Sequence, residues 1–355
     1  MDKNFKINNM DLLRLAAASQ VLLAHGLQHL HIDRPSWWPL FEKLSGVPIF
    51  FVISGYLISA SLERSESYRR YFGNRVRRIY PALWCCIALT LVAALLCGYS
   101  VFTPATVPWV LSQAAGVIYT PSFLQGFGMG SYNGSLWTIP IELQFYVVLP
   151  LLYLVFCRGR ASTRGIFAAF VVFIGVAAVM RQTVPGLGLI DGRHQTLVDR
   201  LLRYTFLPCF YLFLAGVLLQ RWRAHAWRCV RGKGLYWLVG YFAIDLLPLS
   251  QEVNHFAGML VLAMTTVSLA YTAPTLAGRL LRHNDISYGV YIYHGLLMNL
   301  FLQAGLAGHW YHLAALAVLS YLAGYLSWVL VERPLLRHKP IAVPSSQHGM
   351  PAAAG

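Results

Sequence analysis

Long apolar runs, separated by short polar connections, recur along the whole chain. A segment needs about 20 mostly apolar residues to cross a bilayer as a helix, and the sequence contains ten stretches of roughly that length. These runs predict membrane-spanning helices at residues 10–28, 46–63, 79–99, 135–156, 164–181, 201–220, 234–249, 254–273, 286–306 and 310–331. We therefore expect an all-α fold, a polytopic membrane bundle of about ten helices.

One further stretch, 107–119 (VPWVLSQAAGVIY), is short and lies in a segment rich in Pro and Gly. Charge helps to interpret it, because cytosolic loops carry an excess of Lys and Arg. With ten spans and a cytosolic N-terminus, 21 Lys and Arg residues lie in cytosolic segments and 6 in outer ones. A crossing at 107–119 would move every later loop to the other side and spoil this asymmetry. The sequence therefore predicts a re-entrant or interfacial segment on the outer face.

The composition agrees with a membrane protein. Of 355 residues, 57% are hydrophobic and only 12% are charged, about half the charged share of a soluble domain. The net charge of +15 would suit nucleic acid, but the cations lie in short connections and no long hydrophilic region is left for such a domain. We expect one transmembrane domain, residues 1–339, and a disordered cytosolic tail, residues 340–355.

The first predicted span contains two ionisable side chains, Arg14 and His25. Such residues are costly inside a bilayer and usually face the protein interior or a water-filled cavity. Eleven residues amount to three helical turns plus about 20°, so both side chains lie on one face, roughly 16 Å apart along the axis. Taken singly, Arg14 would extend its charge to the membrane surface and His25 would be an ordinary buried histidine. Their shared face favours a ligand that touches both.

The second span contains two small residues, Ser54 and Gly55, within PIFFVISGYLIS. Small residues allow two membrane helices to pack closely, and they equally allow a ligand to approach the backbone. Both interpretations stay open from the sequence.

A basic and aromatic segment, SYRRYFGNRVRRIYP, follows at residues 67–81. Arg75 and Arg78 are three residues apart and share a helix face, and a pair of planar guanidiniums suits phosphate oxygens. The alternative is anchoring at the cytosolic face through contact with anionic lipid. We prefer this alternative for Arg69 and Arg70.

The fourth span begins GSLWTIPIELQFY and places a carboxylate, Glu142, inside the membrane. An intramembrane carboxylate indicates a functional residue, and Arg14 and His25 are its candidate cationic partners. Trp137 suits the membrane interface, but it would also suit a sugar-binding site.

The ninth span reads DISYGVYIYHGLLMN and contributes Tyr288, Tyr291 and His294. Tyr291 and His294 are three residues apart and share a face, so they would either contact a substrate or form a hydrogen bond between helices. At the end of the last span, Glu332 and Arg333 in VERPLL predict an interfacial ion pair with a structural role.

Six of these motifs, in order on the ten-span pattern, resemble the membrane acyltransferase-3 family over essentially the whole chain. They are MDLLRLAAASQVLLAH, PIFFVISGYLI, NRVRRIYP, SLWTIPIELQFY, ISYGVYIYH and VERP. The resemblance implies a ten-span helical bundle that moves an acyl group, typically from cytosolic acetyl-CoA, to a hydroxyl of an envelope saccharide or lipid-linked glycan. The family often has Gly after the first-span Asp, whereas Leu12 follows Asp11 here, so helix packing at this point is expected to differ.

The resemblance also implies roles for individual residues. His25 would act at the reaction centre, either as a general base on the acceptor hydroxyl or as a group that is itself acylated. Glu142 is a candidate to orient His25. The implied donor-binding residues are Arg14, Arg75 and Arg78, and our own hypothesis places Ser54 and Gly55 beside the thioester. Candidate substrate-binding residues are Trp137, Tyr288, Tyr291 and His294.

The expected partners are acyl-CoA, a saccharide or glycolipid acceptor and the bilayer. Acetyl-CoA would be a co-substrate, and we expect no permanently bound cofactor, no metal and no nucleic acid. The six cysteines form no Cys-x-x-Cys pair, which argues against a disulfide framework or a metal site. The family implies the bacterial inner membrane, with both termini in the cytoplasm. The alternative function is a secondary transporter or flippase of a glycan or lipid precursor.

Overall fold

A computed structural model describes residues 5, 7–156, 162–184, 198, 202 and 204–336 of the protein. Regular structure in these ranges is entirely helical, so the predicted all-α class is confirmed for this part of the chain. The α-helices are α2 (Met10–His29), α3 (Trp38–Lys43), α4 (Gly46–Arg64), α5 (Tyr68–Leu96), α6 (Thr106–Ala114), α7 (Thr138–Phe156), α8 (Thr163–Thr183), α10 (Phe210–Arg221), α11 (Gly234–Ala243), α12 (Gln251–Ala270), α13 (Leu276–Leu281), α14 (Ser287–Gln303), α15 (Trp310–Ser327) and α16 (Arg333–Leu336). The predicted tail, 340–355, lies outside the described residues.

Short helical turns connect several of these helices. The 3-10 turns are η1 (Ser122–Leu124), η2 (Gly134–Trp137), η3 (Ala224–Ala226) and η4 (Ile244–Leu246). A π-helical segment, Trp328–Glu332, joins α15 to α16. Both η2 and the π-helix contact the candidate active site described below.

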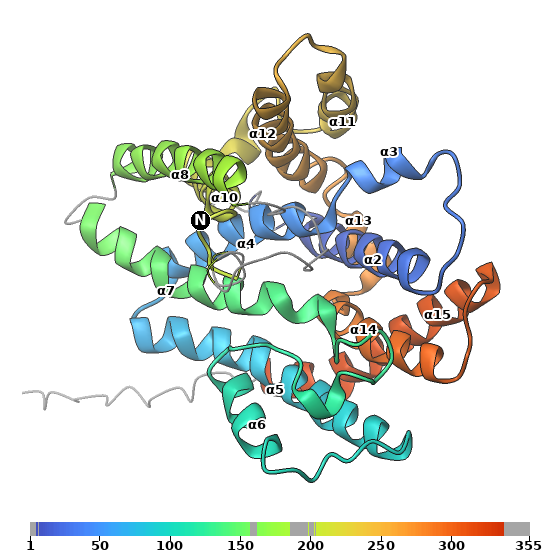
Figure 1. Cartoon of the computed structure of the whole chain (residues 1–355). Coiled ribbons are helices and arrows are strands. Elements are labelled where there is room, and N and C mark those ends of the chain that lie inside the picture. Colours follow the sequence, from blue (N-terminus) through green and yellow to red (C-terminus); the bar gives the residue numbers. More distant parts are fainter. Residues whose placement is uncertain are drawn as a thin grey trace, which may run out of the picture.

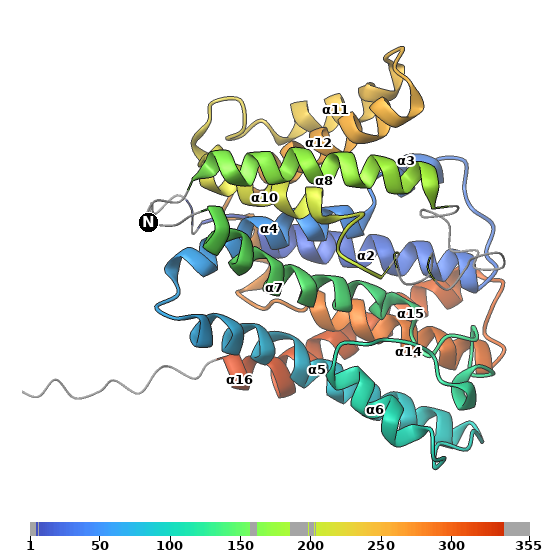
Figure 2. The same ribbon diagram turned by 60° about the vertical axis from the view of Figure 1, so that its left-hand side comes forward.

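The long helices lie side by side in one bundle (Figures 1 and 2). Helices α11 and α12 form one edge of the bundle, α5 and α6 form the opposite edge, and α2 and α4 lie between them. Helix α4 packs mainly against α10 and α2, while α14 packs against α15 and α2. Helix α2, which carries Arg14 and His25, and helix α14, which carries His294, are therefore neighbours.

Six helical stretches among the described residues are long and apolar enough to cross a membrane. They are Trp38–Arg64, Tyr68–Leu96, Gly134–Phe156, Thr163–Thr183, Gln251–Ala270 and Trp310–Leu336. The predicted count of about ten spans is not confirmed. The other four predicted spans fall on α2, α10, α11 and α14, which are helical but either short or rich in polar residues.

The ambiguous stretch 107–119 contains only the nine-residue helix α6. Such a helix is about 14 Å long, less than half of the roughly 30 Å hydrocarbon core. After α6 the chain turns back on itself, because the Trp109 indole donates to the carbonyl of Tyr119 at 2.9 Å and Gln113 donates to that of Val117 at 3.0 Å. The length of α6 agrees with a segment that does not cross the membrane.

Large apolar side chains cover outward faces of the peripheral helices. Val171 and Val172 on α8 are 52% and 61% exposed, and Val318 on α15 is 67% exposed. Polar side chains such as Ser59 and Ser320 are instead fully buried. This arrangement suits a lipid environment, in which backbone polar groups are satisfied within helices and apolar side chains can face outward.

Glycines bring α4 and α10 into backbone contact. A Cβ atom on Gly55 would overlap the carbonyl of Phe213, and one on Gly216 would overlap that of Val52. Helix α4 continues without a break through Gly55. Of the two sequence interpretations for Gly55, the structure favours close helix packing.

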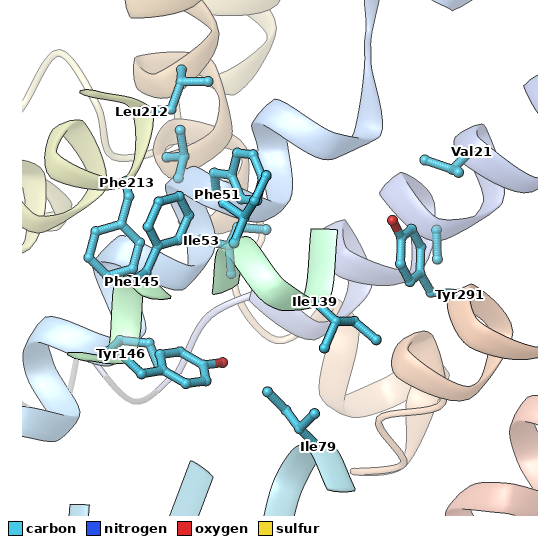
Figure 3. Close-up of a cluster of buried hydrophobic side chains, with 14 of the residues drawn as sticks. Val21, Phe51, Ile53, Ile79, Ile139, Phe145, Tyr146, Leu212, Phe213 and Tyr291 are labelled. Atoms are coloured by element: carbon cyan, nitrogen blue, oxygen red, sulfur yellow. The ribbon is translucent and has the colours of Figure 1, made fainter. Parts of the chain in front are cut away.

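An aromatic cluster fills the space where α4, α7 and α10 meet (Figure 3). The Phe145 ring lies 5.1 Å from the Phe51 ring and 4.6 Å from the Phe213 ring, centroid to centroid. Such aromatic contacts add stability beyond the area that they bury. The cluster fixes α7 against α4, and both helices line the cavity described in the next section.

Candidate active site

A cavity of about 460 Å³ lies among α2, α4, α5, α7 and the start of α14. Seven of the eleven predicted site residues line it: Arg14, Ser54, Arg75, Arg78, Glu142, Tyr288 and Tyr291. The sequence placed these residues on five different helices, and the fold brings them to one space. The other four predicted residues are His25, Gly55, Trp137 and His294, which lie elsewhere.

Two of the cavity arginines are held by carboxylates. Asp285, just before α14, accepts from Arg14 at 3.1 Å and from Arg78 at 2.6 Å. Burial raises the pKa of the Asp285 carboxyl, but Arg78 and Arg14 outweigh this effect and hold the pKa below its ordinary value. Asp285 is therefore ionised at neutral pH, and it fixes both guanidiniums before any ligand arrives.

Glu332 is the second carboxylate that holds Arg78, at a distance of 2.9 Å. The predicted ion pair between Glu332 and Arg333 is therefore wrong. Trp328–Glu332 forms a π-helix, which adds a residue to the turn and changes the direction of the side chains. As a result the fully buried Glu332 carboxylate points toward Arg78, and Ser327 also donates to it at 3.1 Å.

Arg75 differs from Arg14 and Arg78 because no carboxylate of the described residues lies within ion-pair distance of it. Its Nη2 donates to the Ser61 hydroxyl at 2.9 Å. Its buried Nε–H has no hydrogen-bond acceptor in the described structure. A buried unsatisfied donor requires an explanation, and an anionic ligand in the cavity would supply one.

Glu142 lies on the cavity wall, but its contacts differ from those predicted. Its Oε1 accepts from the Ser54 hydroxyl at 3.2 Å and from the hydroxyl of Tyr146. Neither Arg14 nor His25 pairs with it among the described contacts, so the proposed orientation of His25 by Glu142 is not what the structure has. Glu142 and Ser54 form a polar spot within an otherwise apolar stretch of the cavity.

Thr138 and Tyr291 line the cavity next to Ser135, and we call them its inner wall. The Tyr291 hydroxyl donates to the carbonyl of Ser135 at 2.7 Å and lies 2.8 Å from Thr138 Oγ1. The Tyr291 ring packs edge-on against Phe50, with ring centroids 5.5 Å apart. Figure 3 labels Tyr291 and Ile139, two side chains that line the same cavity.

His25 and His294 meet behind this inner wall. Nδ1 of His25 lies 3.2 Å from Nε2 of His294. The Ser135 hydroxyl lies 2.8 Å from His294 Nε2 and 3.4 Å from His25 Nδ1. His294 is fully buried and His25 is half-buried. The sequence left open whether His294 makes a bond between helices, and the structure shows that it does.

The hydrogen bonds of this histidine pair assign its protons. Nδ1 of His294 lies 3.2 Å from the carbonyl oxygen of Val290, which can only accept, so His294 carries its proton on Nδ1 and a lone pair on Nε2. A lone pair on His25 Nδ1 would then face that lone pair. We therefore assign the His25 proton to Nδ1. This tautomer leaves the His25 Nε2 lone pair available to accept a proton.

The remaining two predicted residues do not take part in this arrangement. Gly55 faces α10, as described above. Trp137 ends η2 and is half-buried against the main apolar core, without lining the cavity. Their proposed contacts with donor and sugar find no support in the geometry.

Several residues of the site were not predicted from the sequence, among them Asp285, Ser135 and Ser61. Asp285 directly precedes the ninth predicted span, and a carboxylate at that position could have been flagged as a partner for the buried arginines. Ser135 and Ser61 carry no such signal, because serines are common in membrane helices and only the packing shows what they contact.

Among the described residues, no group of three or more His, Cys, Asp or Glu side chains is placed to hold a metal ion. The expectation that the protein uses no metal stays a prediction. The chemistry available in the site is that of guanidiniums, carboxylates and imidazoles.

Comparisons with known proteins show the family of the chain. A family model described as an acyltransferase domain matches residues 7–331. Nodulation protein 10 of Rhizobium leguminosarum bv. viciae is 32% identical, with 93% of each chain covered. The O-acetyl transferase of Shigella phage Sf6 is 26% identical, over 93% of this chain and 96% of that protein.

A third relative matches only part of the chain. The peptidoglycan O-acetyltransferase OatA of Listeria monocytogenes is 28% identical over 39% of this chain and 24% of its own length. No solved structure matches the chain. The full-length family match nevertheless confirms the resemblance carried by the six motifs: the chain belongs to the membrane acyltransferase-3 family, and it is an acyltransferase.

Proposed function

We propose that the protein transfers an acetyl group from cytosolic acetyl-CoA to a hydroxyl of an envelope saccharide or lipid-linked glycan. The names of two relatives, an O-acetyl transferase and a peptidoglycan O-acetyltransferase, support the acyl group and the acceptor class. The proposed location is the bacterial inner membrane, with both termini in the cytoplasm. No observation favours the alternative of a transporter or flippase.

The proposed binding site for the donor rests mainly on Arg75. It combines a guanidinium without a carboxylate partner, an unsatisfied buried Nε–H and a position on the cavity lining. Phosphate oxygens satisfy such a group well, because charge-assisted hydrogen bonds are stronger than neutral ones. Arg14 and Arg78, already fixed by Asp285, would add positive potential without having to be ordered by the donor.

His25 is the proposed general base. A sugar hydroxyl needs to lose its proton as it attacks the thioester carbonyl, and a base within hydrogen-bond reach accelerates this step. The lone pair assigned to His25 Nε2 would accept that proton, while Nδ1–H stays bonded to His294. The thiolate of CoA would then leave and take this proton from His25 as the ester forms, which returns His25 to its neutral state.

His294 and Ser135 are proposed positioning residues for this base. An imidazole is held in one tautomer and one orientation by what its other nitrogen contacts. Here the lone pair of His294 Nε2 takes that role, and the Val290 carbonyl in turn fixes the His294 proton. The thioester would reach His25 only after the Tyr291 side chain moves, because the inner wall separates His25 from the cavity.

Binding of radiolabelled acetyl-CoA to the purified protein tests the donor half of the proposal. Arg75→Gln should weaken binding about 10- to 100-fold, the loss expected for hydrogen bonds to a charged group. Arg77→Gln is the matched control, because Arg77 is exposed on the same helix and does not line the cavity. Saturable binding that Arg75→Gln leaves unchanged would contradict the proposed donor site.

An assay of acetyl transfer tests the acceptor half of the proposal. Membranes that contain the protein should incorporate radiolabelled acetyl groups from acetyl-CoA into the envelope glycan as esters that alkali releases. Labelled lipid or protein without labelled glycan would contradict the proposed acceptor class and leave the donor assignment intact.

A further inference from the structure

A second cavity, of about 420 Å³, lies beside the first. It is lined by Arg282, His283, Asn284, Trp328, Arg333 and Leu336. Leu336 lines both cavities, so they adjoin each other. The proposed function uses none of the side chains that belong to the second cavity alone.

Trp328 connects the second cavity to the arginines of the first. Its indole N–H donates to Asn284 Oδ1 at 3.0 Å, which fixes the ring. The Arg78 guanidinium lies over this ring, 5.8 Å from its centroid. A ligand that extends past Arg78 and out of the first cavity would therefore meet the second one.

The two cavities differ in charge balance. Four guanidiniums line the first cavity, and four carboxylates (Asp11, Glu142, Asp285 and Glu332) lie on it or pair with its arginines, so the formal charges there cancel. In the second cavity no carboxylate of the described chain lies within ion-pair distance of Arg282 or Arg333. Its two guanidiniums are therefore uncompensated.

Acetyl-CoA carries more negative charge than the first cavity balances. Its diphosphate adds about two charges, and its 3′-phosphate, a phosphomonoester, adds about 1.5 to 2 more at pH 7. Since the formal charges of the first cavity cancel, only the guanidinium of Arg75, which no carboxylate of the described residues pairs with, is left there for the diphosphate. The 3′-phosphate would need cations elsewhere along the donor.

Two neighbouring residues that line the second cavity have an unusual backbone conformation. Arg282 and His283 have φ angles of 48° and 64°, so two successive residues other than glycine adopt the left-handed region. Such conformations are costly and persist where the surroundings fix them, often at ligand sites. This backbone holds Arg282 and His283 on the cavity rather than along a continuing helix.

We propose that the second cavity is the subsite for the 3′-phosphate of the donor, with Arg282 and Arg333 as its ligands. The inference rests on the proposed donor, acetyl-CoA. The same guanidiniums could bind the phosphate of an anionic lipid headgroup, which is the ordinary role of arginines at a membrane surface. The experiment therefore compares both sources of phosphate.

Equilibrium binding of acetyl-CoA and of acetyl-dephospho-CoA, which lacks only the 3′-phosphate, separates the alternatives. The protein is placed in nanodiscs of neutral phosphatidylcholine. We expect the wild type to bind acetyl-CoA about 10- to 100-fold more tightly than the dephospho analogue. The double variant Arg282→Gln with Arg333→Gln should lose this preference and bind acetyl-dephospho-CoA as the wild type does.

Arg279→Gln is the matched control, because Arg279 is exposed on α13 and lines neither cavity; it should keep the preference. Adenosine 3′,5′-bisphosphate should compete with acetyl-CoA in the wild type and much less in the double variant, a readout that also applies to each single variant. Equal binding of both donors by the wild type would overturn the subsite.

If Arg282 and Arg333 bind a lipid headgroup instead, the same experiment gives a different result. If the double variant binds both donors as the wild type does but loses its response to phosphatidylglycerol in the nanodiscs, the arginines bind lipid and the subsite is wrong. If the wild type binds neither donor, the proposed function fails, and this inference fails with it.

Discussion

The cavity and the histidine pair behind it share two helices, α2 and α14, but they are built from different interactions. In the cavity, Arg14 and Arg78 are bound to the ionised Asp285. Behind the inner wall, His25 and His294 are joined to each other and to Ser135 by hydrogen bonds in which no carboxylate takes part. One region is organised by fixed charge and the other by the placement of single protons.

This difference indicates a division of work along α2. Fixed charges suit the binding of an anionic donor, since their positions do not depend on the ligand. A neutral imidazole with one free lone pair suits proton transfer. Substitutions in the cavity should therefore change affinity for the donor, and substitutions in the histidine pair should change the rate of transfer.

The largest effect should come from His25→Ala, which removes the proposed base and no cavity side chain. We expect transfer of labelled acetyl groups to fall about 10²- to 10⁴-fold, with acetyl-CoA binding unchanged. His29→Ala is the control, because His29 lies one turn further along α2, with its ring 6.0 Å from that of His25. Equal losses of binding and transfer would mean that the two regions form a single binding site.

Asp285→Asn tests whether fixed charge organises the cavity. Removing one member of a buried ion pair leaves the other uncompensated, so we expect a loss of about 3 kcal/mol in unfolding free energy, together with weaker donor binding. Chemical unfolding in detergent measures the first effect. Asp245→Asn is the control, because Asp245 pairs with Lys43 but is 54% exposed, and exposed pairs contribute less than about 1 kcal/mol. Similar losses in both variants would refute the clamping role of Asp285.

Two substitutions at His294 separate the effect of its side-chain shape from the effect of its Nε2 lone pair. Gln keeps an acceptor atom for His25 Nδ1–H, whereas Leu does not. We expect His294→Leu to lower kcat about 10- to 100-fold, the range for a hydrogen bond to a group that becomes charged. His294→Gln should lose much less, and neither should change KM for acetyl-CoA. If both substitutions lowered kcat equally, His294 would be a packing residue.

Tyr291→Phe should have the smallest effect. It removes the hydroxyl that joins the inner wall to Ser135 and Thr138, each bond contributing about 1 kcal/mol. We expect a severalfold increase in acetyl-CoA hydrolysis when no acceptor is present, measured as free acetate. Tyr288→Phe, which loses a bond of 3.0 Å to the Ile79 carbonyl on the same cavity, should not increase hydrolysis. No change in Tyr291→Phe would mean that the wall is held by the ring alone.

The sequence predicted the parts of this site that depend on local periodicity. The shared face of Arg14 and His25, and that of Arg75 and Arg78, follow from helix geometry alone. The fold class and the family also followed from the apolar runs and the order of the motifs. The number of spans did not, because polar side chains on α2 and the shortness of α10, α11 and α14 blur the boundary between a span and a buried helix.

Partners that come from distant segments could not be predicted. Gly55 contacts α10 because Gly216 lies opposite, and nothing near Gly55 in the sequence encodes this. Glu332 pairs with Arg78 because a π-helix redirects it, and the motif VERP alone suggests Arg333. Glu142 contacts Ser54 because α7 packs on α4, whereas its contact with Tyr146, four residues further along α7, is local.

The inner wall of Thr138 and Tyr291 has a consequence for the cell as well as for the reaction. Living membranes store energy as ion gradients, and a continuous wet path through a protein would discharge them. Here a buried tyrosine, bonded to Ser135 and packed on Phe50, closes the cavity inside the bundle. In the proposed reaction an acetyl group would pass this wall only when Tyr291 moves, so no continuous water-filled path would need to cross the membrane.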